Sequence, residues 1–78
     1  MLEEIRREIK KAKEYADKSA THQQEAFKLL FEFGIEDPGM IETYAENADN
    51  LQEAITCYIS YGEYSLDKLM EEIKRAGG

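Results

Sequence analysis

One proline and five glycines divide this chain into three segments that can each form a helix. Gly34 ends the first segment, Pro38 begins the second, and Gly62 ends the second. Proline suits the first position of a helix and glycine suits the position just after the last, because each fits the backbone there. These residues predict three helices in one domain spanning 1–78, at approximately 2–33, 38–61 and 65–76.

The first segment has apolar or small residues at alternating steps of four and three, which predicts a helix with one packing face. This series consists of Ile5, Ile9, Ala12, Ala16, Ser19, Gln23, Ala26, Leu30 and Phe33. It passes through Ser19, Ala20 and Thr21 without a change of phase, so we expect one continuous helix. The alternative is that Thr21 and Gln24 form a capping box and start a second helix.

The second and third segments also have helical spacing. Asp37 before Pro38 is a helix start signal, and Ser65 can cap the third helix. Residues 55–61 are rich in β-branched and aromatic side chains, but their apolar positions continue the helical pattern that begins at Ile41. Short connections make neighbouring helices antiparallel. The expected fold is therefore all-α, a three-helix up-down-up bundle with a long first helix.

The unequal lengths of the first two helices predict self-association. At ~1.5 Å per residue, the first would span ~46 Å and the second ~33 Å. The start of the first helix would then project beyond its neighbour and leave apolar side chains in water, which a small domain tolerates poorly. We therefore expect a homodimer or higher oligomer. Its expected interface consists of Leu2, Ile5, Ile9, Gln23, Phe27 and Phe31.

The negative charge is concentrated in the middle of the chain. The net charge is −7, and residues 34–64 contain seven acidic residues but no lysine or arginine. These residues are Glu36, Asp37, Glu42, Glu46, Asp49, Glu53 and Glu63. Such a segment repels phosphate groups, so we expect no direct contact with nucleic acid.

Four of these carboxylates would share one side of a helix at 38–61, opposite its apolar side. They are Glu42, Glu46, Asp49 and Glu53. One interpretation is a docking surface for a basic partner, and the other is an ordinary solvated surface. Tyr61 and Tyr64 flank the corner at Gly62, and tyrosine is enriched at protein interfaces. We therefore expect these six residues to bind a partner.

No pattern of catalytic or metal-binding residues is evident. His22 is the only histidine, and Cys57 has only acidic residues among its charged neighbours in the sequence, which disfavours a reactive thiolate. A di-iron bundle needs inward-facing glutamates and Glu-x-x-His motifs, and here the order is reversed as His22-x-x-Glu25. We expect neither an enzyme nor a bound cofactor or metal.

A single cysteine and the lack of a basic-then-apolar leader after Met1 favour a reducing, cytoplasmic location. The chain has no apolar run of the ~18 residues that would indicate a membrane span. The sequence thus predicts a small helical interaction module that self-associates and binds a protein, for which a basic surface would be complementary. One alternative is a phage-type inhibitor or antitoxin that blocks a nucleic-acid-binding protein by acidic mimicry. A second is a sponge-like, small-ligand-binding or metal-binding helical oligomer.

Overall fold

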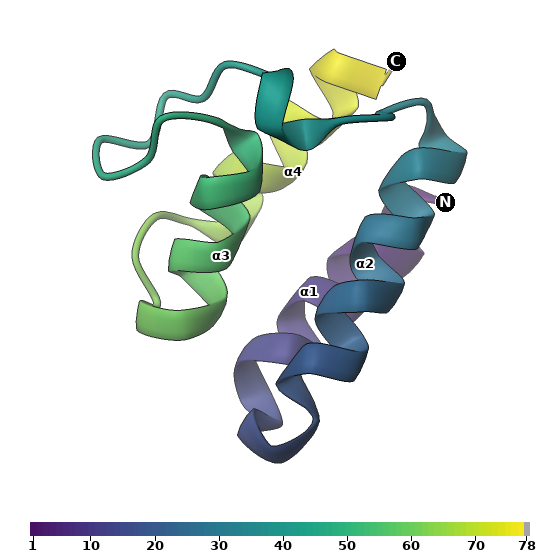
Figure 1. Cartoon of the computed structure of the whole chain (residues 1–78), viewed down its shortest axis with the longest axis vertical. Helices are drawn as coiled ribbons and strands as arrows, with labels where there is room; N and C mark the ends of the chain where they lie inside the picture. Colours follow the sequence, from purple (N-terminus) through teal and green to yellow (C-terminus); the bar gives the residue numbers. More distant parts are fainter. Residues whose placement is uncertain (78) are drawn as a thin grey trace.

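A computed structural model describes residues 1–77, which form four α-helices and two short 3-10 helices with no strand among them (Figure 1). The elements follow the chain as α1 (Leu2–Glu14), η1 (Ala16–Lys18), α2 (Ser19–Phe33), η2 (Pro38–Met40), α3 (Leu51–Tyr61) and α4 (Leu66–Gly77). The prediction of an all-helical chain is confirmed. The prediction of three helices with a long first helix is wrong.

The first segment is a helical hairpin rather than one helix. The backbone leaves the helix at Tyr15 (φ −108°, ψ 79°), passes through η1 and reverses, so that α1 and α2 lie side by side and antiparallel (Figure 1). The predicted capping box does not explain the restart, because α2 begins at Ser19 without a side-chain cap. The hairpin allows α1 and α2 to bury their apolar residues together, worth roughly 1.5–3 kcal/mol for each large side chain.

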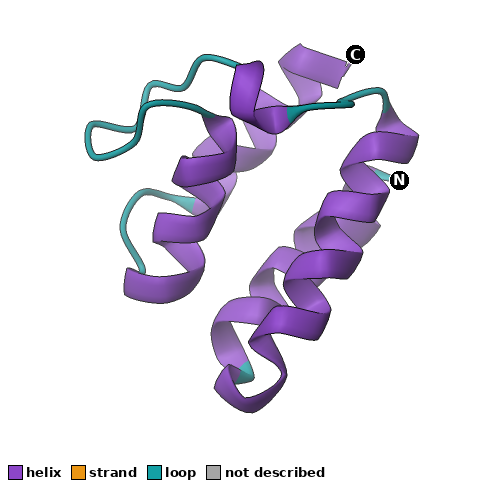
Figure 2. Ribbon diagram, viewed as in Figure 1, coloured by secondary structure: helices purple, strands orange, loops and turns teal. Residues whose placement is uncertain are grey.

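The second segment begins as predicted but does not continue as a helix. Asp37 accepts a hydrogen bond from the Gly39 amide at 3.0 Å, yet only one 3-10 turn follows. The chain is extended at Ile41 (φ −99°, ψ 131°) and then forms the long loop at the upper left of Figure 2. Asn50 caps α3 by accepting from the Glu53 amide at 2.9 Å. The expected helix at 38–61 is therefore correct only from Leu51 onward.

The predicted helix ends at Gly34 and Gly62 are confirmed. Gly34 (φ 111°) follows α2 and Gly62 (φ 70°) follows α3, both in the left-handed conformation that only glycine adopts at little cost. The last helix agrees with its prediction within one residue at each end.

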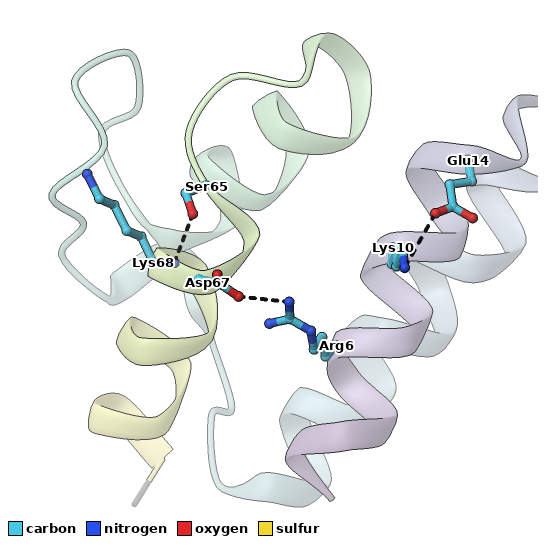
Figure 3. Close-up of polar contacts among 6 residues, drawn as sticks. All are labelled: Arg6, Lys10, Glu14, Ser65, Asp67 and Lys68. Atoms are coloured by element: carbon cyan, nitrogen blue, oxygen red, sulfur yellow. Dashed lines mark hydrogen bonds and ion pairs between the residues drawn. The ribbon is translucent and has the colours of Figure 1, made fainter.

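One core unites the four helices. Its largest fully buried side chains come from every helix: Ile5, Ile9, Leu30, Leu51, Ile55, Leu69 and Ile73. Arg6 on α1 also forms an ion pair with Asp67 on α4 at 2.7 Å, as Figure 3 shows. This pair is solvent-exposed and contributes at most about 1 kcal/mol, so the apolar core is the main contact that holds the helices together. No helix within residues 1–77 has both the length and the apolar character needed to cross a membrane.

Candidate functional site

The predicted acidic helix face does not exist as such. Glu42, Glu46 and Asp49 lie in the loop between η2 and α3, and only Glu53 lies in a helix. The prediction that the four share one side of a helix is wrong, because Asn50, not Asp37, caps the α-helix that follows. All four side chains are nevertheless exposed, so they remain available to a partner.

Two of these four acidic residues take part in the start of α3. The Glu53 carboxylate accepts a hydrogen bond from the Asp49 amide at 2.9 Å, while Asn50 accepts from the Glu53 amide. This resembles a capping box displaced by one residue: Asn50 satisfies the Glu53 amide, which the first turn of the helix leaves without a backbone partner, and Glu53 satisfies the Asp49 amide just before the helix. Glu53 thus has a structural role, whereas the side chains of Glu42 and Glu46 form no hydrogen bond or ion pair within residues 1–77.

The charge of the middle segment is not neutralised by the rest of the described chain. All seven carboxylates of residues 34–64 are exposed. None of them belongs to an ion pair within residues 1–77, where each pair instead involves an acidic residue of α1 or α4. The predicted concentration of negative charge therefore corresponds to an exposed acidic surface, defined here as these seven residues.

The loop at 41–48 and helix α4 enclose adjoining hollows. One has a volume of about 320 Å³ and is lined by Tyr44, Glu72 and Arg75, among others. A second, of about 240 Å³, adds Tyr64 and Lys68 to the same three residues. A third, also about 240 Å³, lies between the loop and α3 and shares Tyr44 and Tyr64. We call this set of hollows the Tyr44 groove.

Both tyrosine rings in the Tyr44 groove face a cation. The guanidinium carbon of Arg75 lies 5.4 Å from the centre of the Tyr44 ring, and Lys68 Nζ lies 5.8 Å from that of Tyr64. Figure 3 shows the Lys68 side chain leaving α4 away from the Arg6–Asp67 ion pair. These distances lie within the range of cation–π attraction.

Glu72 is a buried carboxylate that lines two of the three hollows. Its side chain is only 5% exposed, and one oxygen accepts a hydrogen bond from the Tyr64 hydroxyl. The other oxygen, Oε1, is buried without a hydrogen-bond partner among residues 1–77. A buried polar group in that state costs about 1–3 kcal/mol, and more when it is charged. Most buried polar side-chain atoms in native proteins have a hydrogen-bond partner, so this oxygen is an exception.

Tyr64 supports Glu72 from an unusual backbone conformation. Its φ of 70° makes it the one non-glycine residue with positive φ in residues 1–77. A tyrosine there costs about 1–3 kcal/mol, and such conformations are concentrated at functional sites. Burial, followed by the hydrogen bond to Glu72, raises the pKa of the Tyr64 hydroxyl to about 12. The hydroxyl therefore stays protonated and donating at neutral pH.

The two tyrosines predicted to form one binding corner, Tyr61 and Tyr64, have different surroundings in the structure. Tyr64 lines the Tyr44 groove, but Tyr61 is 77% exposed and does not line any of its hollows. Sequence reasoning did not select Tyr44, Glu72 or Arg75 as site residues. The only local signal for Glu72 is a carboxylate three residues after Leu69, on the edge of the apolar side of α4.

The expected oligomer interface is largely inside the protein. Ile5 and Ile9 are fully buried in the core, which contradicts the prediction that they project beyond a neighbouring helix. The hairpin shortens the first helix and lets α2, α3 and α4 cover them. Leu2, Gln23 and Phe27 are half-buried, and only Phe31 is mostly exposed, at 60%.

The remaining reactive side chains are tied to structural contacts. His22 Nδ1 lies 2.9 Å from Glu8 Oε1 and joins α2 to α1. The Cys57 thiol lies 3.9 Å from the Asn47 carbonyl oxygen. No cluster of three or more His, Cys, Asp or Glu residues in residues 1–77 is arranged to hold a metal ion.

The fold and surface define a class rather than a family. Residues 1–77 form four α-helices and two short 3-10 helices, with an exposed acidic surface and the Tyr44 groove beside it. No protein-family model matches the chain, and comparisons with curated proteins and with solved structures gave no match.

Proposed function

We propose that this chain is a non-catalytic interaction module that binds a protein partner through its acidic surface and the adjacent α3–α4 corner. The observation that carries the proposal is the exposure of all seven middle carboxylates with no ion pair inside the described chain. A surface of one charge sign attracts a complementary surface and speeds the encounter with it. The complementary partner is a protein with a basic face.

Exposed aromatic residues support a protein as the partner. Tyr44 and Tyr61 are 76% and 77% exposed, and each lies between two residues of the acidic surface in the chain. Tyrosine contributes large contact area with little loss of side-chain entropy and is frequent among the residues that dominate binding energy. Carboxylates repel phosphate groups, so the same surface disfavours direct nucleic-acid binding.

An inhibitor of a nucleic-acid-binding protein is a special case of this proposal. Its basic partner would exchange phosphate contacts for contacts with Glu42, Glu46 and their neighbours. Competition between the chain and nucleic acid for the partner distinguishes this case, together with a steep loss of affinity as salt increases.

The test compares two double charge reversals. Glu42→Lys with Glu46→Lys changes the acidic surface at two exposed loop residues, and Glu25→Lys with Glu32→Lys makes the same charge change at exposed positions of α2. We expect affinity capture from host-cell extract to recover a partner with the wild-type chain and the α2 variant but not with the loop variant. Calorimetric titration of that purified partner should give the same order. Equal binding by all three chains would refute the proposal.

We also propose that the chain self-associates, through a smaller surface on α2 than the sequence predicted. Ile5 and Ile9 lie in the core and cannot contact a second subunit. The apolar side chains that support self-association are Phe31, which is 60% exposed, and Phe27, which is half-buried one turn earlier on α2. Two copies of the chain could cover these rings against each other in a two-fold arrangement.

A further inference from the structure

The turn between α1 and α2 carries a hollow that is separate from the acidic surface. In Figure 1 this turn lies at the bottom of the molecule, whereas the loop at 41–48 lies at the upper left. The hollow, which we call the turn hollow, has a volume of about 260 Å³. It is lined by Lys11, Tyr15, Asp17, Lys18 and His22. Pockets for drug-sized ligands begin at about 300 Å³, so this one suits a single functional group or a small ligand.

The reversal of the chain at Tyr15 brings these side chains together. Lys11 lies on α1 and His22 on α2, and eleven residues of continuous helix would separate them by ~16 Å. In the hairpin both line the turn hollow, and the centres of the Tyr15 and His22 rings lie 6.0 Å apart. The turn hollow therefore exists only because the first segment folds back on itself.

His22 presents one ring nitrogen to solvent. Its Nδ1 lies 2.9 Å from Glu8 Oε1, and because a carboxylate only accepts, Nδ1 is the donor. Nε2 has no hydrogen-bond partner within residues 1–77. The one side-chain polar atom that is buried without a partner in those residues is Glu72 Oε1, so Nε2 must reach solvent. There it accepts a hydrogen bond when the ring is neutral and donates one when the ring is an imidazolium.

The charge around the turn favours an anion. Residues 6–18 contain six basic and three acidic side chains, an excess of three positive charges in a chain whose net charge is −7. Lys18 is exposed and belongs to no ion pair within residues 1–77. Lys11 Nζ lies 3.9 Å from Glu8, close to the limit for an ion pair. Asp17 is the one acidic residue among those that line the hollow, and two ammonium groups outnumber it.

The number of donors indicates which anion fits. The two ammonium groups and the His22 ring offer three donors, and a phosphate monoester has three terminal oxygens and about −1.5 to −2 charges at pH 7. Its second pKa is about 6, so a hydrogen bond to Nε2 forms whether the phosphate or the imidazole holds the proton. A carboxylate or a phosphodiester has two such oxygens and a single charge. Either would leave one donor without a partner and attract the lysines less strongly.

We propose that the turn hollow binds a phosphate monoester group, with Lys11 and Lys18 donating to its oxygens and one proton shared between the phosphate and His22 Nε2. The site lies outside the acidic surface, goes beyond the proposed function and does not depend on it. A phosphodiester backbone lacks the second charge, so the site does not make the chain a nucleic-acid-binding protein.

The first arm of the test is an NMR titration at pH 6.5 with small probes. Methyl phosphate supplies the monoester, while dimethyl phosphate and acetate each supply a single charge on two oxygens. Methyl phosphate should shift the amide signals of Tyr15, Lys18 and His22 together with the His22 Nε2 signal, and the other two probes should bind about tenfold more weakly. Equal binding of dimethyl phosphate or acetate, or no shift at these residues, would overturn the proposal.

The second arm compares two exposed lysines that form no ion pair within residues 1–77. Lys18→Gln removes a charge at the turn hollow, and Lys28→Gln makes the same change further along α2. We expect methyl phosphate to bind about threefold more weakly to the first variant and unchanged to the second. Equal binding by the two variants would contradict the site.

The third arm removes the shared proton. His22→Asn retains a side-chain N–H in the position of Nδ1, where it can donate to Glu8, but has no counterpart of Nε2. We expect unchanged helical circular dichroism and about tenfold weaker binding of methyl phosphate. Undiminished binding by the folded variant would overturn the role of His22, and if the variant does not fold, the lysine pair decides.

The source of the phosphate is distinguished by one further probe, acetyl-Gly-phosphoserine-Gly-amide. Affinity equal to that of methyl phosphate supports a small phosphorylated molecule as the ligand, and affinity at least tenfold higher supports a phosphorylated protein side chain. A peptide that binds no better than dimethyl phosphate would contradict the proposal.

Discussion

The hydroxyl of Tyr64 donates a hydrogen bond to the buried carboxylate of Glu72, eight residues further along the chain. Tyr64 does so from the α3–α4 corner with a left-handed backbone, and Glu72 lies in the second turn of α4. The contact fixes the corner relative to the helix that follows. Tyr64 lines the Tyr44 groove, whereas Tyr61 at the end of α3 is exposed to solvent.

Removing this hydroxyl should destabilise the fold. In Tyr64→Phe the second Glu72 oxygen also loses its partner while the ring keeps its packing. We expect the free energy of unfolding in urea to fall by about 1–3 kcal/mol. Tyr61→Phe is the control, because that residue is exposed and should change stability by less than about 0.5 kcal/mol. Equal stabilities of the two variants would contradict a structural role for the hydrogen bond.

The raised pKa of Tyr64 predicts a loss of stability at high pH. Its hydroxyl ionises at about 12 in the folded chain against 10.0 ordinarily, so the folded state holds the proton more tightly. The resulting stability is fully present below about pH 10 and disappears as the pH rises through about 12. Urea unfolding at a series of pH values should show the advantage of the wild type over Tyr64→Phe shrinking across this interval. A constant difference would contradict the prediction.

The burial of Ile9 predicts a core effect rather than an interface effect. Ile9→Ala should lower the free energy of unfolding by about 2–5 kcal/mol, because it leaves a cavity among fully buried neighbours. The thermal midpoint should fall by the same amount at every protein concentration. A loss that grows with dilution would instead show that Ile9 lies between subunits.

Phe31 tests self-association without disturbing the core. Its ring is 60% exposed, so Phe31→Asp should leave the helical circular dichroism unchanged. Sedimentation equilibrium should show a larger mass for the wild type than for this variant, and Glu32→Gln, a neighbouring exposed position, should behave like the wild type. Identical masses for all three chains would exclude Phe31 as a subunit contact.

The break in the first segment shows where reasoning from local pattern failed. The apolar series from Ile5 to Phe33 keeps its phase, and the reversal at Tyr15 occurs without glycine or proline. In the hairpin, Ile9 of α1 and Leu30 of α2 belong to one core. A continuous helix could not bring them together, and helical periodicity is the same in both cases.

The candidate site was predicted only in part. Exposure of Glu42 and Glu46 followed from their charge, and Tyr64 was selected from its position beside Gly62. Tyr44 and Glu72 are far apart in the sequence and separated by α3, so no spacing rule relates them. Their shared groove depends on the path of the loop, which packs Ala45 into the core and leaves Tyr44 outside.

The sequence alone determined the helical class, the helix ends at Gly34 and Gly62, and the concentration of acidic residues between them. Those properties depend on neighbouring residues, through backbone conformation and local charge. Only the tertiary structure decided that the first segment reverses at Tyr15, that residues 41–50 form a loop, and that Glu72 lies beside Tyr44. These depend on which distant apolar side chains bury one another, since that gain in free energy exceeds the cost of interrupting a helix.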